Sequence, residues 1–489
     1  MNSLKELPNN LQDFLSYLSF KSECIFHQER QKIKVDIEAA KELEHKLSTL
    51  IENKTKTLID VMPKITKMKP VNRPKQWTKN DGSLTAKAIE FEQKRREVGM
   101  PEGILSFNVV SEVISGNPSS TPQVKDWLFS LGWEPCTFKY PKAYETDKDG
   151  NPKQPVPQVR YSSAGHPKKG QLTKSVLELA ETHAGVSALD ELTMLNHRLG
   201  IVQKFMSPKF QKDGYISAVA FGFTNTMRFT HEDPVVNLPK VDTPYGKEIR
   251  GLLICEDDEV LVGSDLVSLE DTTKRHYIKP FDPEYVAEME RDGFDPHLDL
   301  ARFRGVISQD DIDRYNDGKA PELKPIRTQY KGTNYSATYG IQANSLARDL
   351  RCSVKEAQGF LDTFWERNKA ILTVSNKVRT KTLKDGSMWL YNPVSKFWYS
   401  LRKERDKFST LNQSTGVFVF DTWLNFCSQK EQWPVLQMHD ESLFVVTKGG
   451  EGHMIEVLDK SMEEVNVKLS LNVEIKHDYN TGKSYAEVH

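Results

Sequence analysis

The stretch Val435 to Val446, VLQMHDESLFVV, constrains the fold of this chain more than any other. Two apolar runs flank a short polar centre, and valine, leucine and phenylalanine alternating with small or polar residues are typical of strands. The stretch predicts a β-hairpin whose tip presents two adjacent carboxylates, Asp440 and Glu441, next to His439. Because an unpaired charge at the end of a buried strand is costly, we expect a divalent metal ion to compensate it.

A second apolar run that ends in a carboxylate supplies a partner for Asp440. It spans Glu259 to Glu270, and Asp265 lies where its predicted strand ends. Oxygen ligands at two strand ends suit Mg²⁺, which keeps several waters and takes further ligands from phosphates. Two such ions about 3.5–4 Å apart clamp the attacking and leaving oxygens of a phosphoryl transfer. The alternative is that Asp265 is an ordinary turn or helix-cap residue.

A third stretch, Lys324 to Gly340, predicts a helix with Pro325 in its first turn. Four of its side chains recur at intervals of four residues and form one stripe on the helix: Arg327, Lys331, Tyr335 and Tyr339. Two cations followed by two aromatic rings suit a nucleoside triphosphate, because cations hold phosphates and rings lie against base and sugar. The alternative is a solvated basic face that turns into a core face.

These stretches, in this order, resemble motifs A, B and C of the family A DNA polymerases. Motif A is matched by Asp265 to Glu270, motif B by Arg327 to Gly340, and motif C by His439 to Glu441. The phrase from Thr226 to Pro239, which contains Arg228, resembles a further signature of the same family. The resemblance extends over nearly the whole chain.

The resemblance implies an α+β chain with the right-hand polymerase fold of thumb, palm and fingers, in which the palm is an antiparallel sheet backed by helices. The implied regions are an N-terminal segment at 1–20, a thumb at 21–205 with an insertion at about 64–115, a palm at 206–290 and 401–489, and fingers at 291–400. No 3′–5′ exonuclease domain is expected before the thumb.

The resemblance also implies a role for each site residue. Asp265, Asp440 and the carbonyl of Leu266 are expected to hold two Mg²⁺ ions, with Mn²⁺ able to substitute, and Lys331 is a candidate proton donor to the leaving group. The residues expected to bind the nucleotide are Arg327, Lys331, Tyr335, Tyr339, His297 and Glu270, the last as a steric gate against a 2′-hydroxyl. The residues expected to contact DNA are Arg228, Gln413, Arg405, His439 and Glu441.

Composition is compatible with such an enzyme. The 489 residues suffice for several subdomains, and a formal net charge of −1 does not exclude local grooves that bind nucleic acid. Five cysteines without a CxxC pair predict neither a zinc site nor disulfides, which fits a reducing cytoplasm. No run of 18 apolar residues is present, so no membrane association is expected.

The remaining patterns predict local structure. Two helices are expected between Phe20 and Pro63, separated around Gln31 to Asp36. Lys54 to Lys79 is strongly basic and reads as a solvated loop or as a strip along a DNA backbone. Thr137 to Gly170 predicts a loop, and Ser353 to Leu383 a further helix.

The expected function is template-directed, primer-dependent DNA synthesis from deoxynucleoside triphosphates, in phage DNA replication. Primer-template DNA is the expected partner, with a separate exonuclease or processivity subunit as a further one. The first alternative is a single-subunit RNA polymerase of related fold, against which Glu270 argues. The second is a catalytically inactive DNA-binding protein, against which both aspartates and the helical stripe argue. A nuclease is a weaker alternative.

Overall fold

The computed structural model describes residues 11–141, 145–161, 170–232, 234–235, 237–350 and 352–488. The chain divides into two units, which we describe separately: unit 1 is Met1–Ala40 with Lys204–His489, and unit 2 is Lys41–Gln203. The chain passes from unit 1 to unit 2 within helix α2 (Ile37–Val61) and returns within α6 (Ala184–Met206). Residues 1–10 of the expected N-terminal segment, and Asp233 in the phrase around Arg228, lie outside the described residues.

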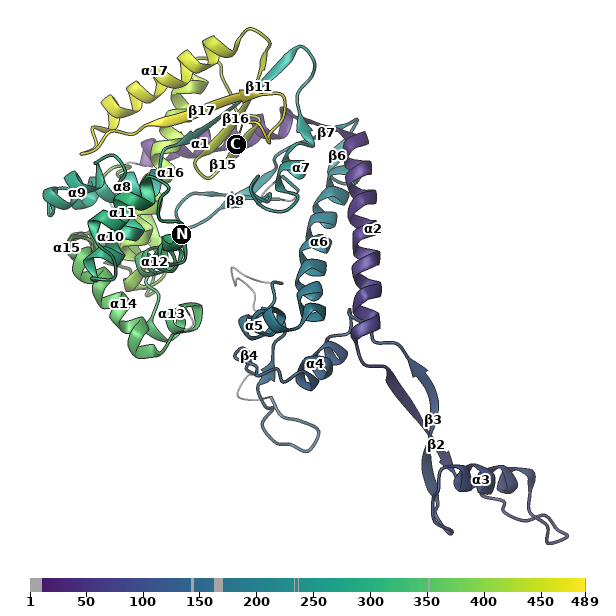
Figure 1. The fold of residues 1–489 in the computed structure, drawn as a ribbon. Helices are drawn as coiled ribbons and strands as arrows, with labels where there is room; N and C mark the ends of the chain where they lie inside the picture. The colour runs from purple at the N-terminus through teal and green to yellow at the C-terminus, as the bar shows by residue number, and fades with distance from the viewer. Residues whose placement is uncertain are drawn as a thin grey trace. The chain divides into compact units, whose positions relative to one another are not determined.

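Unit 1 contains a four-stranded antiparallel sheet (Figure 1). Its strands, in spatial order, are β15 (Leu436–Met438), β16 (Glu441–Thr447), β11 (Glu259–Leu266) and β17 (His477–Gly482). Strands β15 and β16 pair with Met438 opposite Glu441, which confirms the predicted hairpin. In β11, Gly263 is needed because a Cβ there would lie 2.5 Å from the carbonyl oxygen of Val488.

Two long helices, α16 (Lys407–Ser428) and α17 (Glu451–Leu469), contribute with this sheet to one apolar core. Val262 and Leu266 of β11 and Phe444 of β16 pack there with Trp423, whose indole donates to the carbonyl of Leu458 at 3.1 Å. Because side chains alternate along a strand, Asp265 points to the opposite face of the sheet from Val262 and Leu266.

Helix α1 (Leu11–Arg30) is joined to α16 by a buried ion pair. The Lys21 ammonium donates to both oxygens of Asp421 at 2.9 Å and lies 3.8 Å from the centroid of the Phe229 ring. The Tyr17 hydroxyl donates to the same carboxylate at 2.5 Å. Lys21 has no exposed surface. The hydrogen bonds and the opposite charge of Asp421 offset the free-energy cost of burying its ammonium group.

The helices that follow β11 form a second core in unit 1. The helices of this core are α8 (Leu269–Ile278), α9 (Pro283–Met289), α10 (Pro296–Phe303), α12 (Lys324–Thr338), α13 (Ala343–Leu350), α14 (Val354–Arg367) and α15 (Lys369–Lys377), and α11 (Gln309–Asn316) lies between α10 and α12 in the chain. Helix α12 confirms the helix predicted from Lys324, and Tyr330, Thr333 and Ala337 form its buried side. The single helix predicted over 353–383 is wrong: it breaks at Asn368, whose side chain donates back to the carbonyl of Phe364 at 3.0 Å.

Smaller strands complete unit 1. A three-stranded sheet contains β12 (Thr380–Thr382), β13 (Met388–Tyr391) and β14 (Trp398–Leu401), and a pair contains β8 (Ala220–Phe223) and β9 (Phe229–His231). A further sheet has the order β10 (Leu253–Ile254), β1 (Ile33–Val35), β7 (Tyr215–Ile216) and β6 (Gln211–Lys212). The predicted break between the first two helices is confirmed, and it contains β1.

Unit 2 has its own core. This core contains residues of α2, α4 (Thr121–Ser130), α5 (Lys174–Thr182) and α6. The short pair β4 (Phe138–Lys139) and β5 (Val156–Pro157) lies outside the core, and the loop predicted over 137–170 therefore contains regular structure. Trp127, Leu128 and Trp133 are buried in the core, and the Trp133 indole donates to Ser175 at 2.9 Å.

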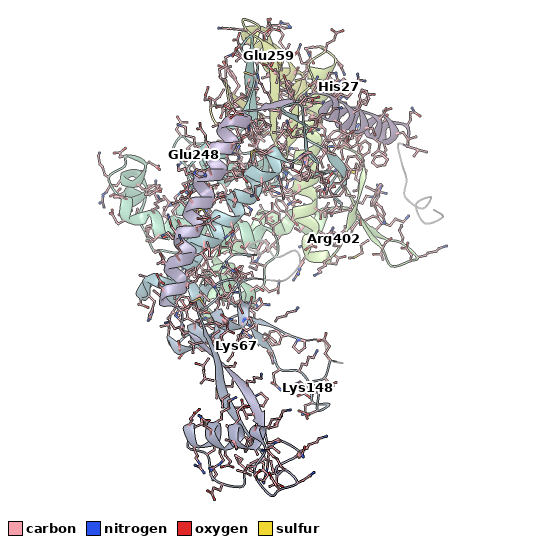
Figure 2. The ribbon with its side chains drawn as sticks, turned by 90° about the vertical axis from the view of Figure 1, so that its right-hand side faces the viewer. His27, Lys67, Lys148, Glu248, Glu259 and Arg402 are labelled. Carbon is pink, nitrogen blue, oxygen red and sulfur yellow. The ribbon has the colours of Figure 1, made fainter. Side chains whose placement is uncertain are left out.

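Residues 64–115 form a separate substructure of unit 2. Strands β2 (Ile65–Asn72) and β3 (Ser106–Ile114) make a two-stranded ribbon, on which Figure 2 labels Lys67, and α3 (Ala86–Glu97) packs Phe91 edge-on against Phe107. The loop predicted from Lys54 to Lys79 is therefore wrong over two parts: α2 continues to Val61, and β2 begins at Ile65.

Candidate active site

The tip of the β15–β16 hairpin brings a strained residue and a carboxylate to the end of the sheet. Only His439 and Asp440 separate the two strands, and His439 has φ 59°, a left-handed conformation that is uncommon for a residue other than glycine. Burial raises the pKa of the Asp440 carboxyl above its ordinary value, and the charge of Arg228 opposes this shift.

The two predicted metal-binding aspartates lie on neighbouring parts of the sheet: Asp265 belongs to β11, and Asp440 directly precedes β16. Asp265 lies near the end of β11 opposite Glu441 of β16, and the next residue, Leu266, donates its backbone N–H to the carbonyl of Asp440 at 3.1 Å. Glu441 itself is buried, and its carboxylate accepts a hydrogen bond from the Tyr485 hydroxyl at 2.7 Å. Asp265 is exposed at the strand end.

The predicted stripe of α12 faces a cavity of about 580 Å³. Tyr335 and Tyr339 keep 51% and 40% of their surfaces exposed, and the Lys331 ammonium lies 5.9 Å from the centroid of the Tyr335 ring. The Arg327 guanidinium donates to Asp295 at 2.5 Å, which orients it at the rim of this cavity.

Asp295 also caps α10. Its carboxylate accepts from the backbone N–H groups of His297 and Leu298 at 2.8 and 3.0 Å. Burial alone would raise the pKa of Asp295, but these hydrogen bonds and Arg327 lower it below its ordinary value. The residue is therefore a fixed anion that positions both His297 and Arg327.

His297 is held as a neutral imidazole. Burial lowers its pKa from 6.5 to about 4. The Asn334 amide donates to the carbonyl of Pro296 at 2.9 Å and contacts His297 Nδ1 at 3.1 Å, so Nδ1 is the acceptor. The remaining proton is consequently on Nε2, which leaves one N–H donor for a ligand.

Glu270 is held from two sides. Arg228 donates to one carboxylate oxygen at 2.7 Å, the Tyr339 hydroxyl donates to the other at 2.7 Å, and the Asn412 amide donates to the backbone carbonyl of Glu270 at 2.8 Å. Burial, and then the Glu270 charge, raise the pKa of Tyr339 to about 12, so its hydroxyl remains a donor. Gln413 of α16 also hydrogen-bonds Tyr339.

The cavity brings together half of the predicted site residues: Glu270, His297, Arg327, Lys331, Tyr335, Tyr339 and Asp440. The others lie outside its lining. Arg228 and Gln413 contact residues of the lining, whereas the side chain of Arg405 packs next to Gly340 beyond the end of α12. His439 precedes Asp440 at the hairpin tip.

Sequence reasoning missed three residues that support the site: Asp295, Asn334 and Asn412. Asp295 could have been found, because an Asp directly before Pro296 is a typical helix start. The two asparagines carry no comparable signal, since their partners lie 38 and 142 residues away in the sequence.

Comparison with known proteins agrees with this architecture. Residues 161–391 match the family model for DNA polymerase family A. DNA polymerase I of Lactococcus lactis subsp. cremoris is 23% identical over 404 residues, which cover 78% of this chain and 43% of the relative. DNA polymerase I of Streptococcus pneumoniae serotype 4 is 25% identical over 288 residues, which cover 54% of this chain and 30% of the relative.

A solved structure shares the fold. The POL domain of Pol1 from M. smegmatis, in complex with DNA primer-template and dNTP, has a TM-score of 0.63 and 17% sequence identity, with 95% of this chain and 69% of that chain covered. The prediction of an α+β polymerase fold with antiparallel sheets is therefore confirmed. The chain spans less than half the length of the curated relatives it matches. The matched sequence and the relatives show that the chain is similar to DNA polymerase family A over residues 161–391, and the solved structure shows that it shares the polymerase fold.

Proposed function

We propose that this chain is a template-directed, primer-dependent DNA polymerase that adds deoxynucleotides in the 5′ to 3′ direction. The observation that carries the proposal is the cavity in which Arg327, Lys331 and neutral His297 lie with an exposed tyrosine and Asp440. The relatives are named DNA polymerase I, and the solved structure of similar fold binds primer-template and dNTP, which supports the same activity here.

Asp265, Asp440 and the Leu266 carbonyl would hold two Mg²⁺ ions, with Mn²⁺ able to substitute. The donors fit, because all are hard oxygens and a cation would offset the burial that raises the pKa of Asp440. Within the described parts of the chain, no three or more Cys, His, Asp or Glu side chains are grouped as a metal site, so waters and substrate would complete the coordination. Such ions lower the pKa of a primer 3′-hydroxyl and neutralise charge on the phosphates.

The chain's own side chains would bind and orient the triphosphate. Arg327, fixed by Asp295, and Lys331 supply positive charge, and His297 donates through Nε2–H without adding a charge. Lys331 would also donate a proton to the leaving pyrophosphate. The exposed rings of Tyr335 and Tyr339 would lie against the base and the sugar of the nascent pair.

Glu270 would exclude ribonucleotides. Its carboxylate is fixed by Arg228 on one side and Tyr339 on the other, so it cannot easily move away from a 2′-hydroxyl. Arg228, Gln413, Arg405, His439 and Glu441 would contact the primer-template. For Arg228 this is chemically feasible, because its side chain keeps 24% of its surface exposed while it pairs with Glu270.

The regional assignment belongs to this proposal. We assign 206–290 and 401–489 to the palm, 291–400 to the fingers and 21–205 to the thumb, with the insertion at about 64–115. On one face of the β2–β3 ribbon, Met68, Val110 and Val113 are more than half exposed. Because a two-stranded ribbon is only marginally stable alone, this face would bind a separate processivity or exonuclease subunit.

The cellular setting is also proposed rather than observed. The structure joins none of the five cysteines in a disulfide, which is compatible with a reducing cytoplasm. Among the described helices, none combines the length and the apolar character that a membrane crossing needs.

Primer extension tests the proposal. We would incubate the chain with primer-template, Mg²⁺ and four deoxynucleotides, and compare wild type with Asp440→Ala and with Asp258→Ala, an exposed aspartate that precedes β11. Extension by wild type and Asp258→Ala, with a loss of at least about a thousandfold in Asp440→Ala, is the expected result.

Other outcomes would redirect the assignment. Equal incorporation of ribonucleotides and deoxynucleotides by wild type would indicate an RNA polymerase-like enzyme. Tight primer-template binding without extension would indicate an inactive DNA-binding protein.

A further inference from the structure

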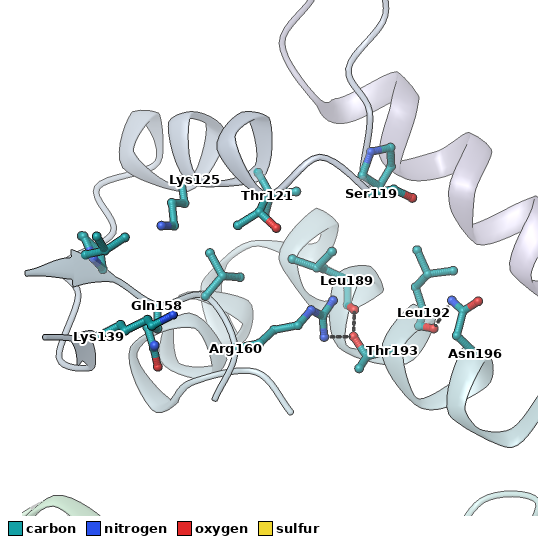
Figure 3. Close-up of a pocket in the computed structure, with 15 residues that line it drawn as sticks. Ser119, Thr121, Lys125, Lys139, Gln158, Arg160, Leu189, Leu192, Thr193 and Asn196 are labelled. Atoms are coloured by element: carbon teal, nitrogen blue, oxygen red, sulfur yellow. Dashed lines mark hydrogen bonds between the residues drawn. The ribbon is translucent and has the colours of Figure 1, made fainter. Parts of the chain in front are cut away.

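Unit 2 contains a pocket that plays no part in the proposed reaction (Figure 3). It encloses about 460 Å³ and is bounded by the start of α4, the β4–β5 pair with the residues after it, and one side of α6. All of its lining residues belong to unit 2. Pockets of about 300–1,000 Å³ are typical of small-molecule sites.

The pocket is positively charged. Lys125 of α4, Lys139 of β4 and Arg160 line it, and no Asp or Glu is among its lining residues. Neither lysine forms an ion pair with a carboxylate in the described part of the chain. The charge therefore favours an anionic ligand.

Arg160 is the most constrained of the three cations. Its Nη1 donates to the Thr193 hydroxyl and to the carbonyl of Gly170 at 3.3 Å, and the Thr193 hydroxyl in turn donates to the carbonyl of Leu189 at 2.9 Å. Figure 3 shows the contacts from Arg160 to Thr193 and from Thr193 to Leu189, on the side of the pocket formed by α6. Arg160 donates both of these hydrogen bonds through Nη1. Among the described residues, Nε and Nη2 have no acceptor, so these two groups can donate to a ligand. Burial lowers the pKa of Arg160, and the charge of Asp190 opposes the shift, but an arginine stays charged at neutral pH.

The rest of the lining is aliphatic. Val124, Val159 and Leu189 are buried, and Leu192 lies beside them. No aromatic ring is among the lining residues, although sites that hold unpaired nucleobases use aromatic rings for stacking. An aliphatic body therefore fits the pocket better than a base does.

We propose that this pocket binds a small organic anion, with its phosphate or carboxylate between Lys125, Lys139 and Arg160 and its aliphatic body against Val124, Leu189 and Leu192. This site is separate from the proposed catalytic reaction, so its test does not depend on DNA synthesis. A free small molecule is favoured over a peptide because the pocket is confined to about 460 Å³ and its lining residues come from three neighbouring parts of unit 2.

Calorimetric titration of the full chain with hexyl phosphate and with hexanoate tests the site. Wild type should bind one molecule with a Kd below about 1 mM. Arg160→Gln should weaken binding by at least about tenfold, since a hydrogen-bonded charge is lost. Lys125→Gln, on the more accessible α4, should weaken it in the same direction, which keeps the test valid where Arg160→Gln fails to fold. Lys148→Gln, an exposed lysine of the same unit outside the pocket (Figure 2), should bind as wild type does.

Two control ligands test the anionic head group and the aliphatic body separately. Inorganic phosphate and 1-hexanol should each bind at least about tenfold more weakly than hexyl phosphate, and the tighter of the two anionic probes identifies the head group. The proposal is overturned when neither probe saturates, when the pocket variants bind as wild type does, or when phosphate or hexanol alone matches hexyl phosphate. It is also overturned, in favour of a peptide site, when acetyl-Glu-Asp-Leu binds tenfold more tightly than both probes.

Discussion

Two ion pairs of unit 1 differ in how completely they are enclosed. The side chains of Lys21 and Asp421 are 0% and 1% exposed, whereas those of Arg228 and Glu270 are 24% and 33% exposed. In the first pair, both oxygens of Asp421 accept from Lys21, and one also accepts from Tyr17. In the second, Arg228 Nε is buried without a partner in the described residues, and Glu270 is shared with Tyr339.

The difference separates a structural pair from a pair that is suited to function. A fully enclosed pair cannot lose one member without leaving a buried charge, so it fixes α1 on α16. A partly exposed pair loses less stability when one member is changed, because water solvates the group that remains. The proposed site uses the second kind, in which Arg228 and Tyr339 hold Glu270 in place while part of its side chain stays exposed.

The largest expected change in unfolding free energy follows from disrupting the enclosed pair of Lys21 and Asp421. Lys21→Ala should lower the free energy of unfolding of unit 1 by about 3–5 kcal/mol, because Asp421 is left buried without its cation. Denaturant titration measures this, with Lys460→Ala, which removes an exposed pair with Glu456, as a control that changes little. Equal effects in both variants would remove the distinction between the two kinds of pair.

The half-exposed pair should affect selectivity more than stability. Glu270→Ala should reduce discrimination between deoxynucleotides and ribonucleotides by about a hundredfold, since the steric barrier to a 2′-hydroxyl is lost. Its unfolding free energy should change by less than about 1 kcal/mol. The ratio of kcat/KM for the two substrates measures selectivity, and Glu270→Gln, which keeps the volume, should retain most of it. Unchanged discrimination in Glu270→Ala would contradict the gate.

His297, which lies in the proposed site, should make the unfolding free energy depend on pH. Its pKa is lowered from 6.5 to about 4, so between these values the unfolded chain binds a proton that the folded chain does not. The stability that His297 contributes is thus present above pH 6.5 and is lost as the pH falls toward 4. Between pH 7 and pH 4.5, wild type should lose about 1–2 kcal/mol more than His297→Gln.

Burial also lowers the pKa values of His231 and His276 to about 4. Both residues are present in wild type and in the variant, so their contributions cancel in the difference between the two losses of unfolding free energy. Parallel losses in wild type and His297→Gln, measured as denaturation midpoints, would show that His297 is not held neutral by the fold.

The smallest expected effect concerns the second contact of Glu270. Tyr339→Phe keeps the ring but removes the hydroxyl that donates to Glu270, a loss of about 1 kcal/mol that should lower deoxynucleotide selectivity about fivefold. Tyr335→Phe is the matched control, and its selectivity should equal that of wild type. A similar decrease in both variants would assign the effect to the helix rather than to this hydrogen bond.

Local patterns predicted the elements of the site well. The hairpin at Val435 to Val446 and helix α12 were predicted from periodicity and are both present. Periodicity did not predict the helix break at Asn368, where the side chain hydrogen-bonds to a backbone carbonyl. It also did not predict β1, a strand of three residues that pairs with strands distant in the sequence. Short strands gain their stability from their neighbours, so their own sequence carries little signal.

The sequence by itself determined which residues could carry the chemistry: two aspartates after apolar runs, a stripe of cations and rings on one helix, and a glutamate five residues after the first aspartate. Only the tertiary structure decided how these groups are held. It pairs Arg228 with Glu270 across 42 residues and Lys21 with Asp421 across 400, assigns the proton of His297 through Asn334, and encloses the pocket of unit 2. The physical reason is that periodicity records what one element buries, whereas a contact between distant residues depends on how the elements pack together.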